Sequence, residues 1–196
     1  MKARVVGTQR REFLKKAGLG SMALAASGIL SYMQTTPAQA AGPINFHFLA
    51  VSAAGIVDEV HHQILMGGHG GITSGTVVGN GSFQHQDVNP ENPTPQPILG
   101  EGTWKAKKLV SFEINGTYGV GISGVLTMEV NLVPVSGPII SAMLEVVCNI
   151  PPAGLFTGKP EGYTLTIPGA PFGPFTPLGP PPLGITWFTK TVEPKD

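Results

Sequence analysis

The sequence predicts an all-β domain of about nine or ten short antiparallel strands. Three observations predict this fold class: apolar and polar residues alternate with period two, Asn-Gly pairs lie between apolar runs, and no apolar stripe of helical period follows residue 40. A closed barrel would leave no long exposed sheet edge. We therefore expect an antiparallel β-barrel, with a two-sheet β-sandwich as the alternative.

The alternation is clearest at 126–132, where Leu126, Met128, Val130 and Leu132 share one face. Residues 46–48 and 163–167 alternate in the same way. The face of 104–112 is interrupted by Lys108, which indicates a bend or bulge. Further strands are expected at 57–66, 75–79, 82–88, 117–122, 139–149 and 185–191.

Residues typical of turns and loops separate these expected strands. Asn115-Gly116 and Asn80-Gly81 are typical of two-residue hairpin turns, because both central residues of a type I′ turn need positive φ. The run 67–71, with four glycines around His69, is expected to be a further turn. The proline-rich stretches 89–97 and 169–183 are predicted to be loops, because proline cannot donate a hydrogen bond to a central ladder.

The first 40 residues have the layout of an export signal: a basic start, an apolar stretch at 17–33, and the small-residue site Ala38-Gln39-Ala40. Arg10 and Arg11, followed by Phe13 and Leu14, resemble the twin-arginine (Tat) signal. The resemblance implies recognition by the Tat translocase, export of a folded protein to the periplasm or outside the cell, and cleavage between Ala40 and Ala41. The expected domains are therefore a cleaved signal helix at 1–40 and one secreted β-domain at 41–196.

A retained membrane helix is the alternative for 17–33. Seventeen residues interrupted by three glycines fall short of the roughly 20 strongly apolar residues that a span prefers, so no stable membrane anchor is expected. Residues 41–196 carry six basic and eleven acidic side chains, a net charge of −5. This balance argues against nucleic acid as a partner. Cys148 is the only cysteine and lies in phase with Leu144 and Val146, so we expect it to be buried.

All five histidines fall between positions 47 and 85. A hairpin could bring His62, His69 and His85 together, with Asp87 or Glu59 as an oxygen ligand. Imidazole and carboxylate ligands would suit zinc, copper or iron. No His-Glu-x-x-His helix accompanies them, and ordinary surface or hydrogen-bonded histidines are the simpler interpretation.

No spacing typical of a catalytic site occurs, so the leading hypothesis is a non-enzymatic module that binds a protein or an apolar small molecule. The loop 170–175 places Phe172 and Phe175 between prolines, and exposed aromatics there would form a stiff contact surface. Deleting 170–182 should then leave the fold intact.

Two alternatives remain open: a metal-binding protein or metalloenzyme that uses residues 47–85, and an isomerase-like or cyclase-like barrel. The run Gly79-Asn80-Gly81-Ser82-Phe83 resembles the Gly-x-Gly-x-Phe strands of dirigent and allene-oxide-cyclase-type barrels. That resemblance implies a barrel and assigns no catalytic residue. An enzyme of this kind would need an interior cavity with a few polar groups.

Overall fold

The computed structural model describes residues 44–191 except positions 93 and 180, and it confirms the all-β class. The described residues form nine strands and one short 3₁₀ helix: β1 (Ile44–Val57), β2 (Val60–Thr73), β3 (Thr76–Asp87), β4 (Ile98–Tyr118), β5 (Gly121–Pro134), β6 (Ile140–Cys148), η1 (Pro151–Ala153), β7 (Gly162–Thr166), β8 (Thr176–Pro177) and β9 (Gly184–Lys190). No helix in this part of the chain is long and apolar enough to cross a lipid bilayer.

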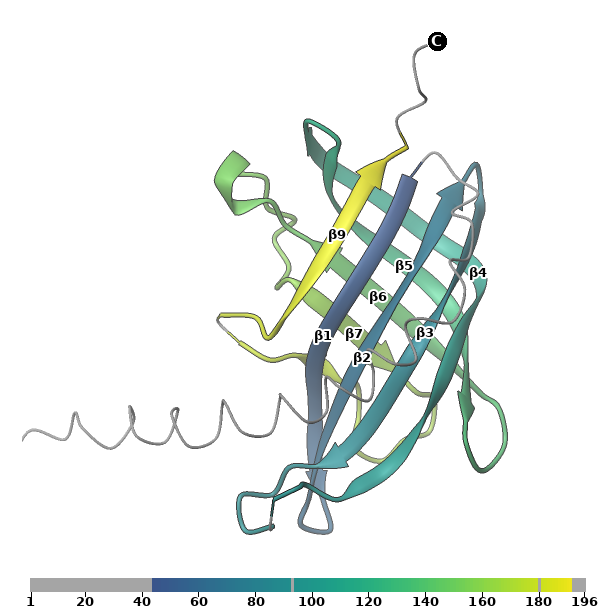
Figure 1. The fold of residues 1–196 in the computed structure, drawn as a ribbon, viewed down its shortest axis with the longest axis vertical. Coiled ribbons are helices and arrows are strands. Elements are labelled where there is room, and N and C mark those ends of the chain that lie inside the picture. Colours follow the sequence, from purple (N-terminus) through teal and green to yellow (C-terminus); the bar gives the residue numbers. More distant parts are fainter. Residues whose placement is uncertain (1–43, 93, 180, 192–196) are drawn as a thin grey trace, which may run out of the picture.

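All the strand pairs are antiparallel and belong to one sheet, in the order β4-β3-β2-β1-β9-β5-β6-β7. A further pairing of β4 with β5 closes a hydrogen-bonded ring through β1, β2, β3, β4, β5 and β9. In Figure 1, β9, β1, β2 and β3 lie in front of β5, β6 and β7, and the long strand β4 connects the two layers. The core therefore lies between the two layers.

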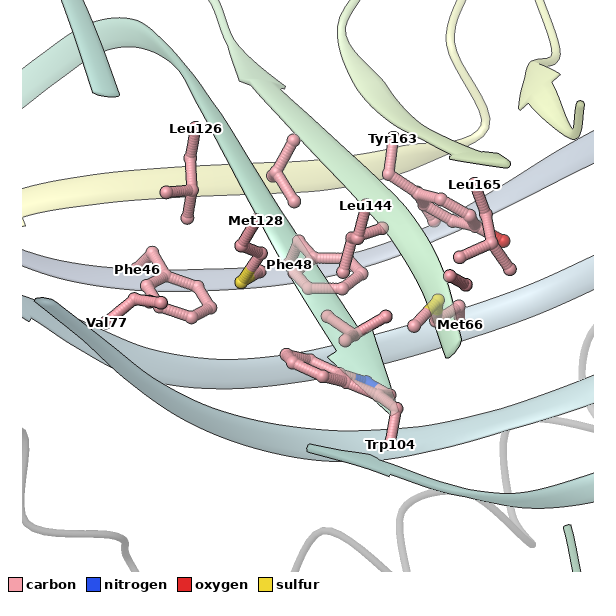
Figure 2. Packing of buried hydrophobic residues seen from close by; sticks show 14 of the residues in the cluster. Phe46, Phe48, Met66, Val77, Trp104, Leu126, Met128, Leu144, Tyr163 and Leu165 are labelled. Carbon is pink, nitrogen blue, oxygen red and sulfur yellow. The ribbon is translucent and has the colours of Figure 1, made fainter. Parts of the chain in front are cut away.

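Alternation decides which side chains enter this core, as predicted. Leu126, Met128 and Val130 of β5 are fully buried, and Trp104 of β4 is 1% exposed. Figure 2 shows Leu126, Met128 and Trp104 packed in one cluster with Phe46 and Phe48 from β1 and Leu144 from β6. Large apolar side chains therefore occupy the space between the layers.

Two polar side chains anchor β7 within this core. The Tyr163 hydroxyl donates to the carbonyl of Ile64 at 2.7 Å, and the Ser52 hydroxyl donates to the carbonyl of Tyr163 at 2.7 Å. Full burial raises the pKa of Tyr163, which keeps the phenol protonated and able to donate. These bonds connect Tyr163 of β7 to Ser52 of β1 and Ile64 of β2, which lie 111 and 99 residues away in the sequence.

The Asn-Gly turn predictions are wrong at both places, and so is the predicted turn at 67–71. Asn80-Gly81 lies inside β3, Asn115-Gly116 lies inside β4, and 67–71 lies inside β2. Glycine is needed there for space, because a Cβ on Gly81 would lie 2.5 Å from Nε1 of Trp104. The hairpin between β1 and β2 turns instead at Asp58 and Glu59, which both have positive φ without being glycine.

Cys148 is buried, as the phase of its strand predicts. Its thiol lies 3.5 Å from the carbonyl of Thr186 on β9. Burial raises the pKa of the thiol, so the side chain stays in its less reactive protonated form. Cys148 therefore acts as a small apolar residue of the core.

Candidate functional site

One candidate site lies where β2 and β3 approach the proline-rich loop. His62 Nδ1 and His85 Nε2 are 2.9 Å apart, so one ring donates a hydrogen bond to the other. The register pairs Ile64 with His85 and His62 with Asp87, which makes the two histidines diagonal neighbours. His62 follows the parity of Ile64 and Met66, and His85 follows that of Phe83, so both lie on the core side of the sheet. Strand alternation alone gives this face for His62, because it is separated from Ile64 and Met66 by even numbers of residues.

The loop brings its two phenylalanines onto this pair. Phe172 lies 4.4 Å from His62 between ring centroids, and Phe175 meets His85 edge-to-face at 5.4 Å. The carbonyl of Phe172 accepts a hydrogen bond from the amide of Gly55, and Phe175 exchanges two backbone hydrogen bonds with Leu165. We call His62, His85, Phe172 and Phe175 the ring-end cluster.

The expected exposure of these loop aromatics is wrong. Phe175 is 1% exposed and belongs to the core, and Phe172 is half-buried against it. The segment that follows pairs with β1 through Thr176 and Pro177. Since these residues close the core, we now expect deletion of 170–182 to unfold the domain rather than leave it intact.

Burial favours the neutral form of both histidines of the cluster. Burial, with a smaller contribution from His62, lowers the pKa of His85 to about 4. Burial also lowers the pKa of His62, against the opposing effect of the Asp87 carboxylate. A neutral pair fits the 2.9 Å contact, because two protonated imidazoles would repel each other and neither could accept the hydrogen bond.

The low pKa of His85 predicts acid sensitivity. Because the pKa is about 4 in the folded state and about 6.5 in the unfolded state, the unfolded chain binds more protons between these values. Stability should therefore fall as the pH is lowered from 6.5 to 4, by about 1–3 kcal/mol from this group, with no further loss below pH 4. Urea unfolding at a series of pH values measures the slope of the free energy of unfolding against pH.

His85→Gln should flatten this slope relative to the wild type. His61→Gln, which removes the adjacent histidine but neither ring of the pair, is the matched control and should keep the slope. Asp87 also makes stability depend on pH, and it is present in the wild type and in both variants. The effect of His85 is therefore measured by the difference in slope between the three proteins. An unchanged slope in His85→Gln would contradict the neutral pair.

Asp87 has a structural role beside the cluster. Its Oδ1 accepts hydrogen bonds from the amides of His61 at 2.8 Å and Asn89 at 3.1 Å, and its Oδ2 accepts one from Asn92 Nδ2 at 2.8 Å. These hydrogen bonds, that from His61 above all, lower the pKa of Asp87. The carboxylate therefore holds the start of the loop after β3 in place.

His69 does not join His62 and His85. It lies seven residues further along β2, roughly 23 Å away at the rise of a strand, and its odd position places it on the opposite face. The described residues contain no group of three or more His, Cys, Asp or Glu side chains arranged to hold a metal ion. The predicted set of His62, His69 and His85 therefore does not come together. It depended on a turn at 67–71, whereas β2 continues through these residues and places His69 on the other face of the sheet.

A second candidate site was not apparent from the sequence. It is a hollow of about 190 Å³ on the outer face of β9, β1 and β2, and we call it the outer hollow. Two exposed apolar side chains of β9 border it: Ile185 is 58% exposed and Trp187 is 54% exposed. Its full lining is His47, Phe48, Leu49, Gly68, His69, Ile185 and Trp187.

The histidines of the outer hollow are cross-strand partners. His47 pairs with His69 on one side and with Trp187 on the other, and the two imidazole rings stack at 5.9 Å. Burial, together with His69, lowers the pKa of His47. His69 Nε2 is shielded from water and finds no hydrogen-bond partner among the described residues, which leaves one polar atom of this site unsatisfied.

Comparison with protein-family models, with curated proteins and with solved structures finds no match for this chain. The residues predicted to be read as a signal, among them Arg10, Arg11, Phe13 and Leu14, lie outside the described residues, as do Ala40 and Ala41. The candidate sites therefore rest on the geometry of residues 44–191 alone.

Proposed function

We propose that this protein is an exported, non-enzymatic β-domain that binds a neutral, ring-bearing apolar small molecule in the outer hollow. The observation that carries the proposal is the exposed indole of Trp187 beside a hollow that His69 also lines, with a shielded Nε2 that has no hydrogen-bond partner among the described residues. A lining of mostly apolar and aromatic side chains with a few polar groups is typical of a small-molecule site. Leu49 and Ile185 supply the remaining apolar contacts.

The proposed ligand is neutral because its surroundings are uncharged. The lining contains no carboxylate, lysine or arginine, and the lowered pKa of His47 favours its uncharged form. A ring could stack on the indole while one hydroxyl or N–H group bonds to His69 Nε2.

The closed ring of strand pairs through β1, β2, β3, β4, β5 and β9 favours a barrel over a two-sheet sandwich. Its closure depends on β5 and β9, which pair only at Gly121 with Thr189 and at Ile122 with Phe188. Slow amide hydrogen exchange along this short ladder would support the barrel, whereas rapid exchange would favour two separable sheets.

An isomerase-like or cyclase-like barrel receives no support from the interior. Trp104, Leu126 and Met128, all of them buried, pack where such an enzyme would need space for its substrate. The outer face is therefore the better place to look for a ligand.

Export rests on the resemblance of residues 1–40 to a Tat signal, with the Tat translocase as the transient partner and the periplasm or the exterior as the destination. An Arg10→Lys/Arg11→Lys chain that still left the cytoplasm would contradict it.

Saturation-transfer NMR tests the binding site, with phenol and indole as neutral, largely apolar ring probes. We expect at least one probe to receive saturation from the wild-type chain and to lose most of it with Trp187→Ala. Ile114→Ala is the matched control, because Ile114 of β4 is also 53% exposed and lies outside the outer hollow. Equal signals from the wild type and Trp187→Ala, or no signal from any probe, would overturn the proposal.

A further inference from the structure

A row of side chains crosses the outer face of the sheet through the outer hollow. The register aligns Trp187 of β9 with His47 of β1, His47 with His69 of β2, and His69 with Asn80 of β3. Side chains of directly paired residues have Cβ atoms about 4.5–5.5 Å apart on the same face. Two imidazoles therefore stand side by side, with an indole on one flank and a carboxamide on the other.

The geometry of the two imidazoles suits a shared ligand. Their planes lie 22° from parallel at a centroid separation of 5.9 Å, so small changes in the side-chain torsions would bring one nitrogen of each ring toward a common point. The hollow of about 190 Å³ beside them leaves room for an ion and its remaining water ligands. His69 lines that hollow, and its Nε2 is shielded from water without a hydrogen-bond partner among the described residues, so a change in the side-chain torsions would present an unused ligand atom to an ion.

We propose that His47 and His69 together bind one divalent transition-metal ion, Cu²⁺, Ni²⁺ or Zn²⁺, through an imidazole nitrogen of each. Neutral imidazole is the preferred nitrogen ligand of these three ions. Asn80 stands next in the row and has an amide oxygen of its own. The positions that the protein does not fill stay open to water or to a small ligand.

One further observation distinguishes this pair from the ring-end cluster. At the ring-end cluster, by contrast, His62 Nδ1 and His85 Nε2 are already bonded to each other, and phenylalanine rings pack against both histidines. An ion there would first have to break a partly buried hydrogen bond, whereas His47 is exposed.

This inference shares His69 with the ring-bearing ligand proposed above, but it needs His47 as the second ligand and does not need the face of the indole. Trp187 provides the readout, since Cu²⁺ and Ni²⁺ quench the fluorescence of a nearby indole. Trp104, the second tryptophan, is buried in the core, and its Nε1 donates to the carbonyl of Gly67. The Trp187→Phe variant therefore separates the two signals.

The experiment titrates the full chain with Cu²⁺, Ni²⁺ and Zn²⁺ by isothermal calorimetry, and with the first two by fluorescence. We expect one ion per chain in the wild type, and affinity weakened about tenfold or more in His47→Ala and in His69→Ala, since even outer-shell substitutions cost 10–100-fold. His61→Ala is the matched control and should bind like the wild type. Trp187→Phe should retain calorimetric binding while the quenching disappears.

Wild-type affinity in His47→Ala would overturn the inference, and so would loss of binding in a His62→Ala/His85→Ala double variant. Because His47 is exposed, its replacement leaves the core intact, and circular dichroism confirms folding of each variant. If no ion binds while a ring probe still contacts Trp187, the metal inference fails and the proposed function stands. The reverse result would leave the metal site and remove the ring ligand.

Discussion

Gly81→Ala should destabilise the domain by about 3 kcal/mol or more, which lowers Tm by roughly 10 °C for a domain of this size. Gly81 faces Gly68 on one neighbouring strand and Trp104 on the other, and the indole Nε1 donates to the carbonyl of Gly67 at 3.0 Å. An added Cβ would lie 2.5 Å from that nitrogen and 2.6 Å from the Cα of Gly68. Because one of these neighbours is backbone, the sheet itself would have to move.

Gly100→Ala is the matched control for this experiment. Gly100 also lies on a paired strand, and a Cβ there would meet nothing within 4 Å. Its substitution should change the free energy of unfolding by no more than about 0.5 kcal/mol. Thermal unfolding followed by circular dichroism measures both variants. Equal Tm values for Gly81→Ala and the wild type would contradict the register of β2, β3 and β4.

Phe175→Ala should cost about 3–5 kcal/mol of unfolding free energy, the range for truncating a buried phenylalanine. The ring is 1% exposed and packs against both His85 and Phe172. Its backbone is bonded in both directions to Leu165 of β7. Removing the ring opens a cavity where the proline-rich loop closes the core, and urea unfolding measures the loss.

Phe156→Ala is the control for this truncation, because that ring is 58% exposed. It should change stability by no more than about 0.5 kcal/mol. If Phe175→Ala unfolded at the same urea concentration as Phe156→Ala, the loop would be a surface feature and the sequence-based prediction of an exposed contact would regain support.

The strand pattern could be predicted because alternation is a local consequence of strand geometry. Leu126, Met128 and Val130 are buried as their spacing predicts, and so is Cys148. The hairpin turns could not be predicted in this way. Asn80-Gly81 has the composition of a turn, yet Gly81 is there to leave room for Trp104, a neighbour that is distant in the sequence. The amino-acid sequence around a glycine does not show whether the glycine allows a turn or leaves room for a neighbouring side chain.

The same distinction applies to the candidate sites: strand alternation predicts some of their features, and contacts between distant residues decide the others. The face of His62 followed from the parity of β2, whereas the separation of His69 depended on β2 continuing through four glycines. The sequence suggested the phenylalanines of the loop and the histidines of β2 and β3 as two unrelated features. Their contact at 4.4 Å between His62 and Phe172 depends on how the loop folds back over the core.

The sequence by itself determined the all-β class, the buried face of the central strands and the burial of the single cysteine, because each follows from side chains that alternate along one strand. Tertiary structure alone decided that His47 stands between His69 and Trp187. Those neighbours lie 22 and 140 positions further along the chain. Register and sheet order decide which residues of different strands share a row, and both depend on the packing of the whole core.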